Sequence, residues 1–89
     1  MDYFMYIVRC SDNSLYVGST SNVEQRVNDH NAGKGGYTTR KKKPVKLVYY
    51  EIYDSKEIAL LREMQLKGWS RIKKENLIKY VHPNKEKSK

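Results

Sequence analysis

The 89-residue chain has a single cysteine and no apolar stretch long enough to cross a lipid bilayer. One thiol excludes an intramolecular disulfide and a metal site built from four cysteines. Cys10 lies in an apolar run, so we expect an unreactive core thiol. The start, Met1-Asp2-Tyr3, lacks the basic residues that open a secretory signal peptide. We therefore expect a reduced, cytoplasmic protein.

Acidic residues are scarce relative to basic ones. Eighteen Lys and Arg stand against ten Asp and Glu, which gives a net charge of +8. Such a chain attracts polyanions and meets them faster. No helix combines a basic face with a broad apolar one, so we expect no membrane partner and favour nucleic acid. High lysine content can also serve solubility alone, and charge does not separate these two interpretations.

The chain shows no internal repeat and no linker, which predicts one domain over residues 1–81 and a basic, flexible tail at 82–89. The aromatic and β-branched run at 3–10 predicts a strand buried on both faces. Residues 15–18 should return as the second strand of an antiparallel hairpin, and residues 45–53 should form a third strand. Several tyrosines are best interpreted as strand packing residues: Tyr3, Tyr49, Tyr50 and Tyr53.

Two capping boxes predict where helices begin. Ser21 with Glu24 fits the start of one helix, and Asp54 with Glu57 fits the start of another, which Gly68 ends. The expected helices run to about residue 31, over 55–67 and over 70–79. The order ββαβαα predicts an α+β fold, a small three-stranded antiparallel sheet flanked by helices.

A glycine- and lysine-rich loop is expected over residues 33–44, exposed and suited to contact a large ligand. Its phosphate contacts would carry little sequence information and would weaken steeply with salt. No separate recognition module is visible, so specific cutting would depend on nucleic-acid shape or on a protein partner. The expected contacts are Lys34, Arg40, Lys41, Lys42, Lys43, Lys73 and Lys74.

Two polar residues share the face of the first helix that should turn inward. Val23, Arg26, Val27 and His30 follow the spacing i, i+3, i+4 and i+7. The structural interpretation is that the aliphatic stem of Arg26 covers apolar surface, while His30 lies at the end of the helix and interacts favourably with the helix dipole. Taken alone, each residue is more often structural than functional.

Glu63 lies in a helix whose apolar residues at 58–61 and 64 predict burial over a broad arc. An unpaired buried charge is very unfavourable, so Glu63 needs a partner. Spacing favours a structural ion pair over a metal ion. The candidate partners are Arg62, Lys67 and Arg26.

The spacing of five residues carries a resemblance to a known family. Tyr6 is followed after nine residues by Tyr16-Val17-Gly18, Arg26 lies eight residues beyond Gly18, and His30 four beyond Arg26. This pattern resembles the GIY-YIG nuclease superfamily, most closely its small stand-alone bacterial members, the YhbQ-like endonucleases. The similarity covers the chain to about residue 79, and Gly18 belongs to the structural motif. The matching stretches are residues 4–10, 14–20, 26–31 and 59–63.

The resemblance implies the fold described above and a Mg²⁺- or Mn²⁺-dependent endonuclease, acting on DNA in preference to RNA. Its catalytic positions fall on Tyr6, Tyr16, Arg26, His30 and Glu63. Glu63 would hold the ion, and Arg26 would neutralise the phosphate. Structure-selective cleavage, a role in DNA repair or recombination, and a monomeric state are further expectations. The alternatives are a binding module of the same fold that barely cleaves, or an adaptor in a larger complex.

A water molecule is the expected nucleophile, with Tyr6 as its general base and Tyr16 positioning the phosphate or the water. Free tyrosine has a pKa of roughly 10, so Tyr6 would need a nearby cation to act near neutrality. Arg26, the metal, or His30 as a proton relay could supply the shift. Which tyrosine acts as the base stays open at the level of sequence.

Two departures from the family pattern are visible. Phe4 and Met5 replace the glycine and isoleucine of the first motif, which is tolerable because the tyrosine carries the chemistry. The family often has a late asparagine, for which the candidates here are Asn76 and Asn84.

Overall fold

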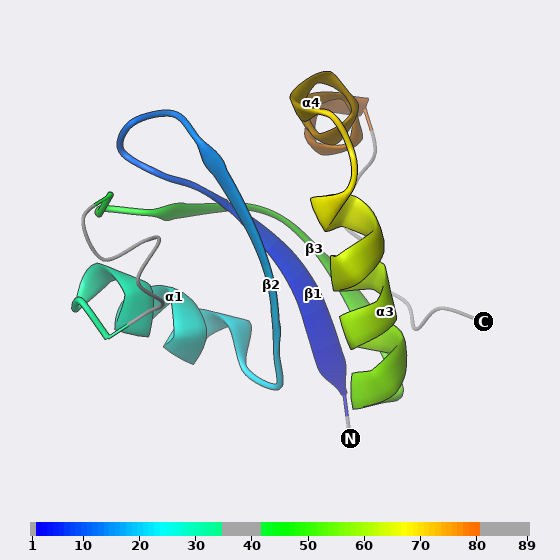
Figure 1. Ribbon diagram of the computed structural model, residues 1–89. Coiled ribbons are helices and arrows are strands. Elements are labelled where there is room, and N and C mark those ends of the chain that lie inside the picture. Colours follow the sequence, from blue (N-terminus) through cyan, green and yellow to red (C-terminus); the bar gives the residue numbers. More distant parts are fainter. Residues whose placement is uncertain (1, 35–41, 81–89) are drawn as a thin grey trace.

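A three-stranded antiparallel sheet of order β2-β1-β3 forms the centre of the computed structural model, which describes residues 2–34 and 42–80 (Figure 1). The predicted α+β fold and element order are confirmed. The expectations for Arg40, Lys41, Asn84 and the tail lie outside the described residues. The elements are β1 (Tyr3–Arg9), β2 (Leu15–Thr20), α1 (Val23–Asn31), β3 (Lys46–Tyr53), α3 (Lys56–Lys67) and α4 (Arg71–Tyr80).

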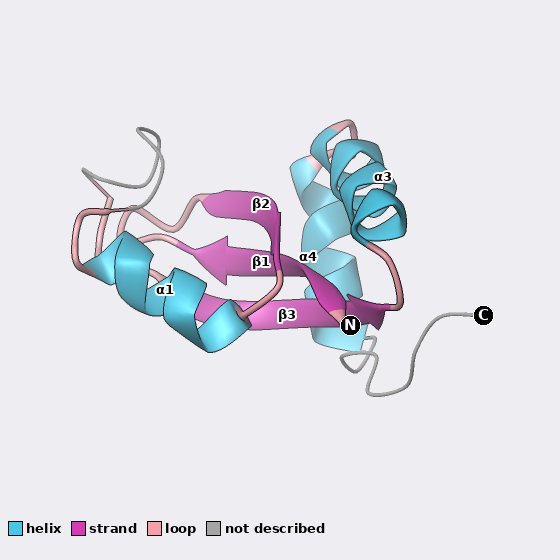
Figure 2. Ribbon diagram, turned by 90° about the horizontal axis from the view of Figure 1, so that it is seen from below, coloured by secondary structure: helices cyan, strands magenta, loops and turns pink. Residues whose placement is uncertain are grey.

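Strand β1 is the central strand and is buried on both faces, as its continuous apolar run predicts. Successive side chains of a strand point to opposite faces. Tyr6 and Val8 therefore join the cluster on the α1 side, while Met5 and Ile7 join the cluster on the α3 side. Figure 1 shows α1 and α3 on opposite sides of the sheet, and Figure 2 shows the same arrangement from below.

Both predicted helix caps are wrong by one residue. Asn22, and not Ser21, caps α1, and its side chain accepts from the Gln25 backbone N–H at 3.0 Å. Strand β2 pairs with β1 as far as Thr20, two residues beyond the predicted end, so the turn into the helix starts later. In α3 the cap is Ser55 and not Asp54, because it is the Ser55 hydroxyl that accepts from the Ile58 backbone N–H, at 3.1 Å.

The predicted burial of α3 over a broad arc is also wrong. Only Ala59 and Leu66 are buried, whereas Leu61 is 66% and Met64 68% exposed. Ile58 and Leu60 are exposed as well. The helix touches the sheet along one narrow stripe, and α4 lies beyond the C-terminal end of α3 and not along its outer face (Figure 1). None of the helices in the described part of the chain has the length and apolar character of a membrane span.

Candidate active site

The register of the β1–β2 hairpin places Tyr6 directly opposite Gly18. A Cβ atom on Gly18 would lie 2.6 Å from the Tyr6 hydroxyl oxygen and 2.7 Å from its Cζ. The Tyr6 ring therefore lies across the backbone of Gly18, and only glycine leaves room for it. Tyr16 lies two residues before Gly18 and faces the same side of the sheet.

His30 joins the two tyrosines from the last turn of α1. It is fully buried, and its Nε2 lies 3.0 Å from the Tyr6 hydroxyl. The Tyr16 ring meets the imidazole edge to face, with centroids 5.4 Å apart. Burial lowers the pKa of His30, and the charge of Arg26 lowers it further. The imidazole is therefore neutral near neutral pH and able to accept a proton.

Arg26, one turn before His30, lies close enough to Tyr6 to affect the pKa of the Tyr6 hydroxyl. Burial raises the pKa of Tyr6 to about 12, and the nearby Arg26 offsets only part of this rise. The cation expected beside Tyr6 is thus present, but burial outweighs it. Tyr6 is protonated near neutral pH and suited to pass its proton on to His30.

Glu63 reaches the same region from α3. The Ser19 hydroxyl donates to its Oε1 at 2.6 Å, and the Lys67 ammonium lies 2.7 Å from its Oε2. The predicted ion pair is confirmed, with Lys67 as the partner. Arg62, another expected partner, instead binds Glu51 at 2.9 Å. Ser19, 44 residues away in sequence, was not anticipated, although it directly follows Gly18.

Strand β2, an edge of the sheet, separates Glu63 from the tyrosine cluster. Tyr16 points to the α1 side and Ser19 to the α3 side, because they lie an odd number of residues apart. The two groups nevertheless influence each other. The charge of Glu63 contributes to the raised pKa of Tyr6, and Tyr16 contributes to the raised pKa of Lys67, whose main cause is the bond to Glu63. The candidate site therefore spans both sides of the β2 edge.

The donor set around Glu63 fits a magnesium ion that the protein holds through one carboxylate. No cluster of three or more His, Cys, Asp and Glu is present among residues 2–34 and 42–80. Mg²⁺ keeps several waters and often takes only one or two carboxylates, the remainder coming from substrate phosphates. Glu63 matches that pattern.

The predicted phosphate contacts lie in different environments. Lys34 and Lys43 are exposed, whereas Lys42 forms an ion pair with Asp12 at 3.5 Å. Lys73 lies over the Trp69 ring, 4.3 Å from its centroid. Lys74 is half-buried and Asn76 is exposed, both on α4.

Asn31 is a positioning residue that sequence reasoning missed. Its side chain accepts from the Val45 backbone N–H at 2.6 Å and donates to the Val45 carbonyl at 3.1 Å. These two bonds fasten the C-terminal end of α1, and with it His30, to the start of β3. An asparagine just after His30 was visible in the sequence, but its partner was not.

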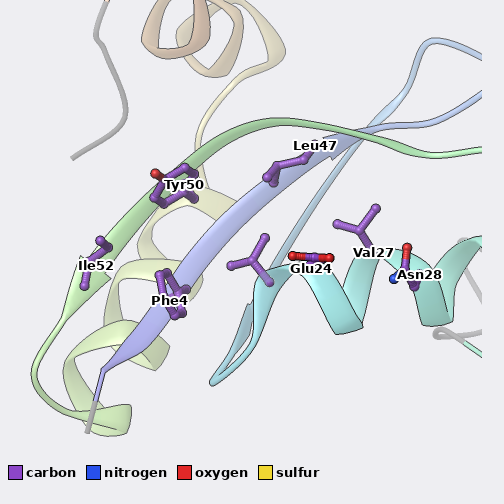
Figure 3. Close-up of a pocket in the computed structure, with 8 residues that line it drawn as sticks. Phe4, Glu24, Val27, Asn28, Leu47, Tyr50 and Ile52 are labelled. Atoms are coloured by element: carbon purple, nitrogen blue, oxygen red, sulfur yellow. The ribbon is translucent and has the colours of Figure 1, made fainter. Parts of the chain in front are cut away.

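A cavity of about 440 Å³ lies between α1 and the sheet, on the same sheet face as Tyr6 (Figure 3). Glu24 and Asn28 line it from α1. The inward-facing Val23 and Val27 of the same helix line it as well, but Tyr6, Arg26 and His30 are not among its lining residues. The remaining lining residues are Phe4, Leu47, Tyr50 and Ile52.

A small antiparallel sheet that pairs a motif tyrosine with a motif glycine, under a helix carrying arginine and histidine, defines a class of catalytic domain. Residues 2–76 match the GIY-YIG catalytic domain, and the chain belongs to this family.

Within the family, the chain is similar to proteins named UPF0213. It is 49% identical to the UPF0213 protein of Haloquadratum walsbyi over 75 residues. This alignment covers 84% of this chain and 84% of the relative. It is 50% identical over 76 residues to that of Staphylococcus haemolyticus, covering 85% of this chain and 93% of the relative. The solution NMR structure of the UPF0213 protein from Bacillus halodurans matches with a TM-score of 0.59 and 40% identity, over 91% of this chain and 86% of that one.

Proposed function

We propose that this protein is a single-domain endonuclease that hydrolyses phosphodiester bonds, with DNA favoured over RNA. The observation that carries the proposal is the buried contact of Tyr6 with His30, with Arg26 close enough to lower the pKa of Tyr6, in a chain of the GIY-YIG family. A net charge of +8 supports a polyanionic substrate. Nuclease domains of this family typically depend on a divalent metal, and Glu63 is the proposed ligand.

Arg26 would bind the scissile phosphate. Its guanidinium is permanently charged and planar, which matches two phosphate oxygens and stabilises the negative charge that the transition state gains. Bound at Glu63, a Mg²⁺ or Mn²⁺ ion would add Lewis-acid stabilisation of the same charge. Tyr16, at the edge of the cluster, would orient the phosphate.

Tyr6 and His30 would move the proton. Water attacks phosphorus and gives its proton to the Tyr6 oxygen, while the Tyr6 hydroxyl proton passes to Nε2 of His30 across 3.0 Å. The leaving oxygen takes a proton from solvent. This relay uses Tyr6 in its protonated form, so it does not require a free tyrosinate from a group whose pKa burial raises to about 12.

The test is a panel of single-stranded, duplex, flapped and branched DNAs and the matching RNAs, incubated with Mg²⁺ or Mn²⁺. We expect cleavage of at least one DNA, reduced about 10²–10⁴-fold by Tyr6→Phe. Tyr50→Phe is the matched control, because Tyr50 is the neighbour of Tyr6 on β3 and lines the separate cavity. An equal loss of cleavage in Tyr6→Phe and Tyr50→Phe would show that Tyr6 has no special part in the reaction.

A second candidate function is a nucleic-acid-binding module with little cleavage. The favouring observation is that both oxygens of Glu63 are already bound, one by Ser19 and one by Lys67. Tight binding of the panel without any cleavage would support this alternative. For the enzyme we further propose a monomeric, cytoplasmic protein that selects its substrate by shape or with a partner, in repair or recombination.

A further inference from the structure

The Glu63 carboxylate is held by two contacts of different character. Ser19 donates from β2 at 2.6 Å, and Lys67 pairs from the next turn of α3 at 2.7 Å. The Glu63 side chain is 14% exposed, whereas that of Lys67 is 52% exposed. The serine contact is thus enclosed between helix and sheet, and the lysine contact is open to solvent.

Ser19 can keep its bond when a cation binds Glu63. Its backbone is placed by pairing with Met5 in the ladder of β1 and β2. A carboxylate offers about four lone-pair sites, so one hydroxyl donor leaves room for another ligand. Ser19 therefore fixes the direction of Glu63 without blocking it.

Lys67 cannot keep its contact in the same way. Its ammonium occupies Oε2, and a second cation at that oxygen would be repelled by it. The side chain is flexible and has water as an alternative partner. Of the two contacts, that of Lys67 is the one that gives way.

We propose that Lys67 is a built-in competitor for the divalent cation at Glu63, while Ser19 is the positioning residue that holds the carboxylate ready. This inference rests on the proposed function, since it concerns the same metal ligand.

The experiment measures Mn²⁺ binding to the full-length, metal-free protein without nucleic acid, by calorimetry and by electron paramagnetic resonance. Lys67→Met should bind Mn²⁺ about threefold tighter than Lys56→Met, the size expected for loss of a partly exposed ion pair. Lys56 is the matched control, an exposed lysine of the same helix with the same charge change. Lys67→Arg should restore the weaker affinity, and Ser19→Ala should weaken binding about threefold.

Two outcomes would overturn the inference and separate it from the proposed function. If Lys67→Met binds no tighter than Lys56→Met, while Glu63→Gln abolishes binding, Lys67 is no competitor and the metal assignment stands. If Lys67→Met and the double variant Lys67→Met/Glu63→Gln bind Mn²⁺ equally, both the competitor and Glu63 as metal ligand are refuted. Circular dichroism on each variant verifies that the fold is retained.

Discussion

Tyr6 shows at the scale of one residue how packing sets chemistry. Its side chain is almost fully buried, and its hydroxyl meets His30 and the backbone of Gly18, with Arg26 nearby. Burial raises the pKa of Tyr6 more than the nearby Arg26 guanidinium lowers it, so the tyrosine stays protonated. His30 is kept neutral by the same burial, so the pair can pass a proton without either group carrying a charge at rest.

Gly18 leads to a prediction about both stability and activity. In Gly18→Ala the new methyl group would lie 2.6 Å from the Tyr6 hydroxyl oxygen, so the Tyr6 ring must move. We expect a loss of about 1–3 kcal/mol in unfolding free energy, as for overpacking, together with loss of cleavage. Urea denaturation measures the first quantity and single-turnover cleavage the second.

Gly68→Ala is the control for this prediction. A Cβ atom there meets only the Gln65 carbonyl oxygen, at an ordinary 3.5 Å, and its backbone φ is −85°. Similar destabilisation by both substitutions would mean that the close contact with Tyr6 has no special weight.

At the scale of helices and strands, networks of side-chain hydrogen bonds and ion pairs hold the helices against the sheet. On α3, Arg62 binds the buried Glu51 of β3. Tyr49 and Tyr53, expected only to pack, also donate hydrogen bonds to that carboxylate. Burial alone would raise the pKa of Glu51, but the bonds from Arg62 and the two tyrosines outweigh it and lower the pKa. The charge is therefore retained inside the fold.

Helix α4 is tied to the hairpin by Arg9, which forms two bonds to Glu75 at 2.7 and 2.9 Å. These bonds lower the pKa of Glu75 to about 2 from an ordinary 4.5. A carboxyl group whose pKa is lowered by folding stabilises the folded state at pH values above the pKa that the group has in the unfolded chain. That stabilisation is lost as the pH falls from 4.5 towards 2.

The corresponding prediction compares Glu75→Gln with the parent protein at pH 6 and pH 3. The parent should lose more unfolding free energy between these pH values than the variant, which has no charge at this position to lose. Glu57→Gln, an exposed carboxylate in the first turn of α3, is the control and should behave as the parent does. An identical pH dependence in all three proteins would contradict the role of the Arg9–Glu75 pair. Urea titrations supply the free energies.

Charge distribution matters at the scale of the whole molecule. The net charge of +8 predicts binding that weakens with salt. Replacing Lys34, Lys42 and Lys43 by Ala should flatten the slope of log Kd against log salt concentration, by up to about 0.9 for each phosphate that the variant no longer neutralises. Lys42 should contribute least, because Asp12 already holds it.

The control for the salt experiment removes the same charge elsewhere. Lys46, Lys56 and Lys79 are exposed and belong to β3, α3 and α4. Fluorescence anisotropy on a labelled DNA at several salt concentrations measures both triple variants. Equal slopes in the two would place the binding surface away from the segment that joins α1 to β3.

Local patterns in the sequence determined the element order, the burial of β1 on both faces, and the inward face of α1 that carries Arg26 and His30. These features depend on residue spacing along one strand or one helix, so they can be read without knowing the neighbours. The pattern of residues 3–18 also predicted the hairpin that carries Tyr6 and Tyr16, whereas their joint role was implied by the family resemblance alone.

Only the tertiary structure decided which groups meet across elements. It exposed Leu61 and Met64, because the sheet covers just one side of α3. It gave Glu63 the partners Ser19 and Lys67, and it raised the pKa of Tyr6 where a lowered one was expected. Burial and contacts between segments far apart in sequence depend on how the elements pack, and no local pattern contains that information.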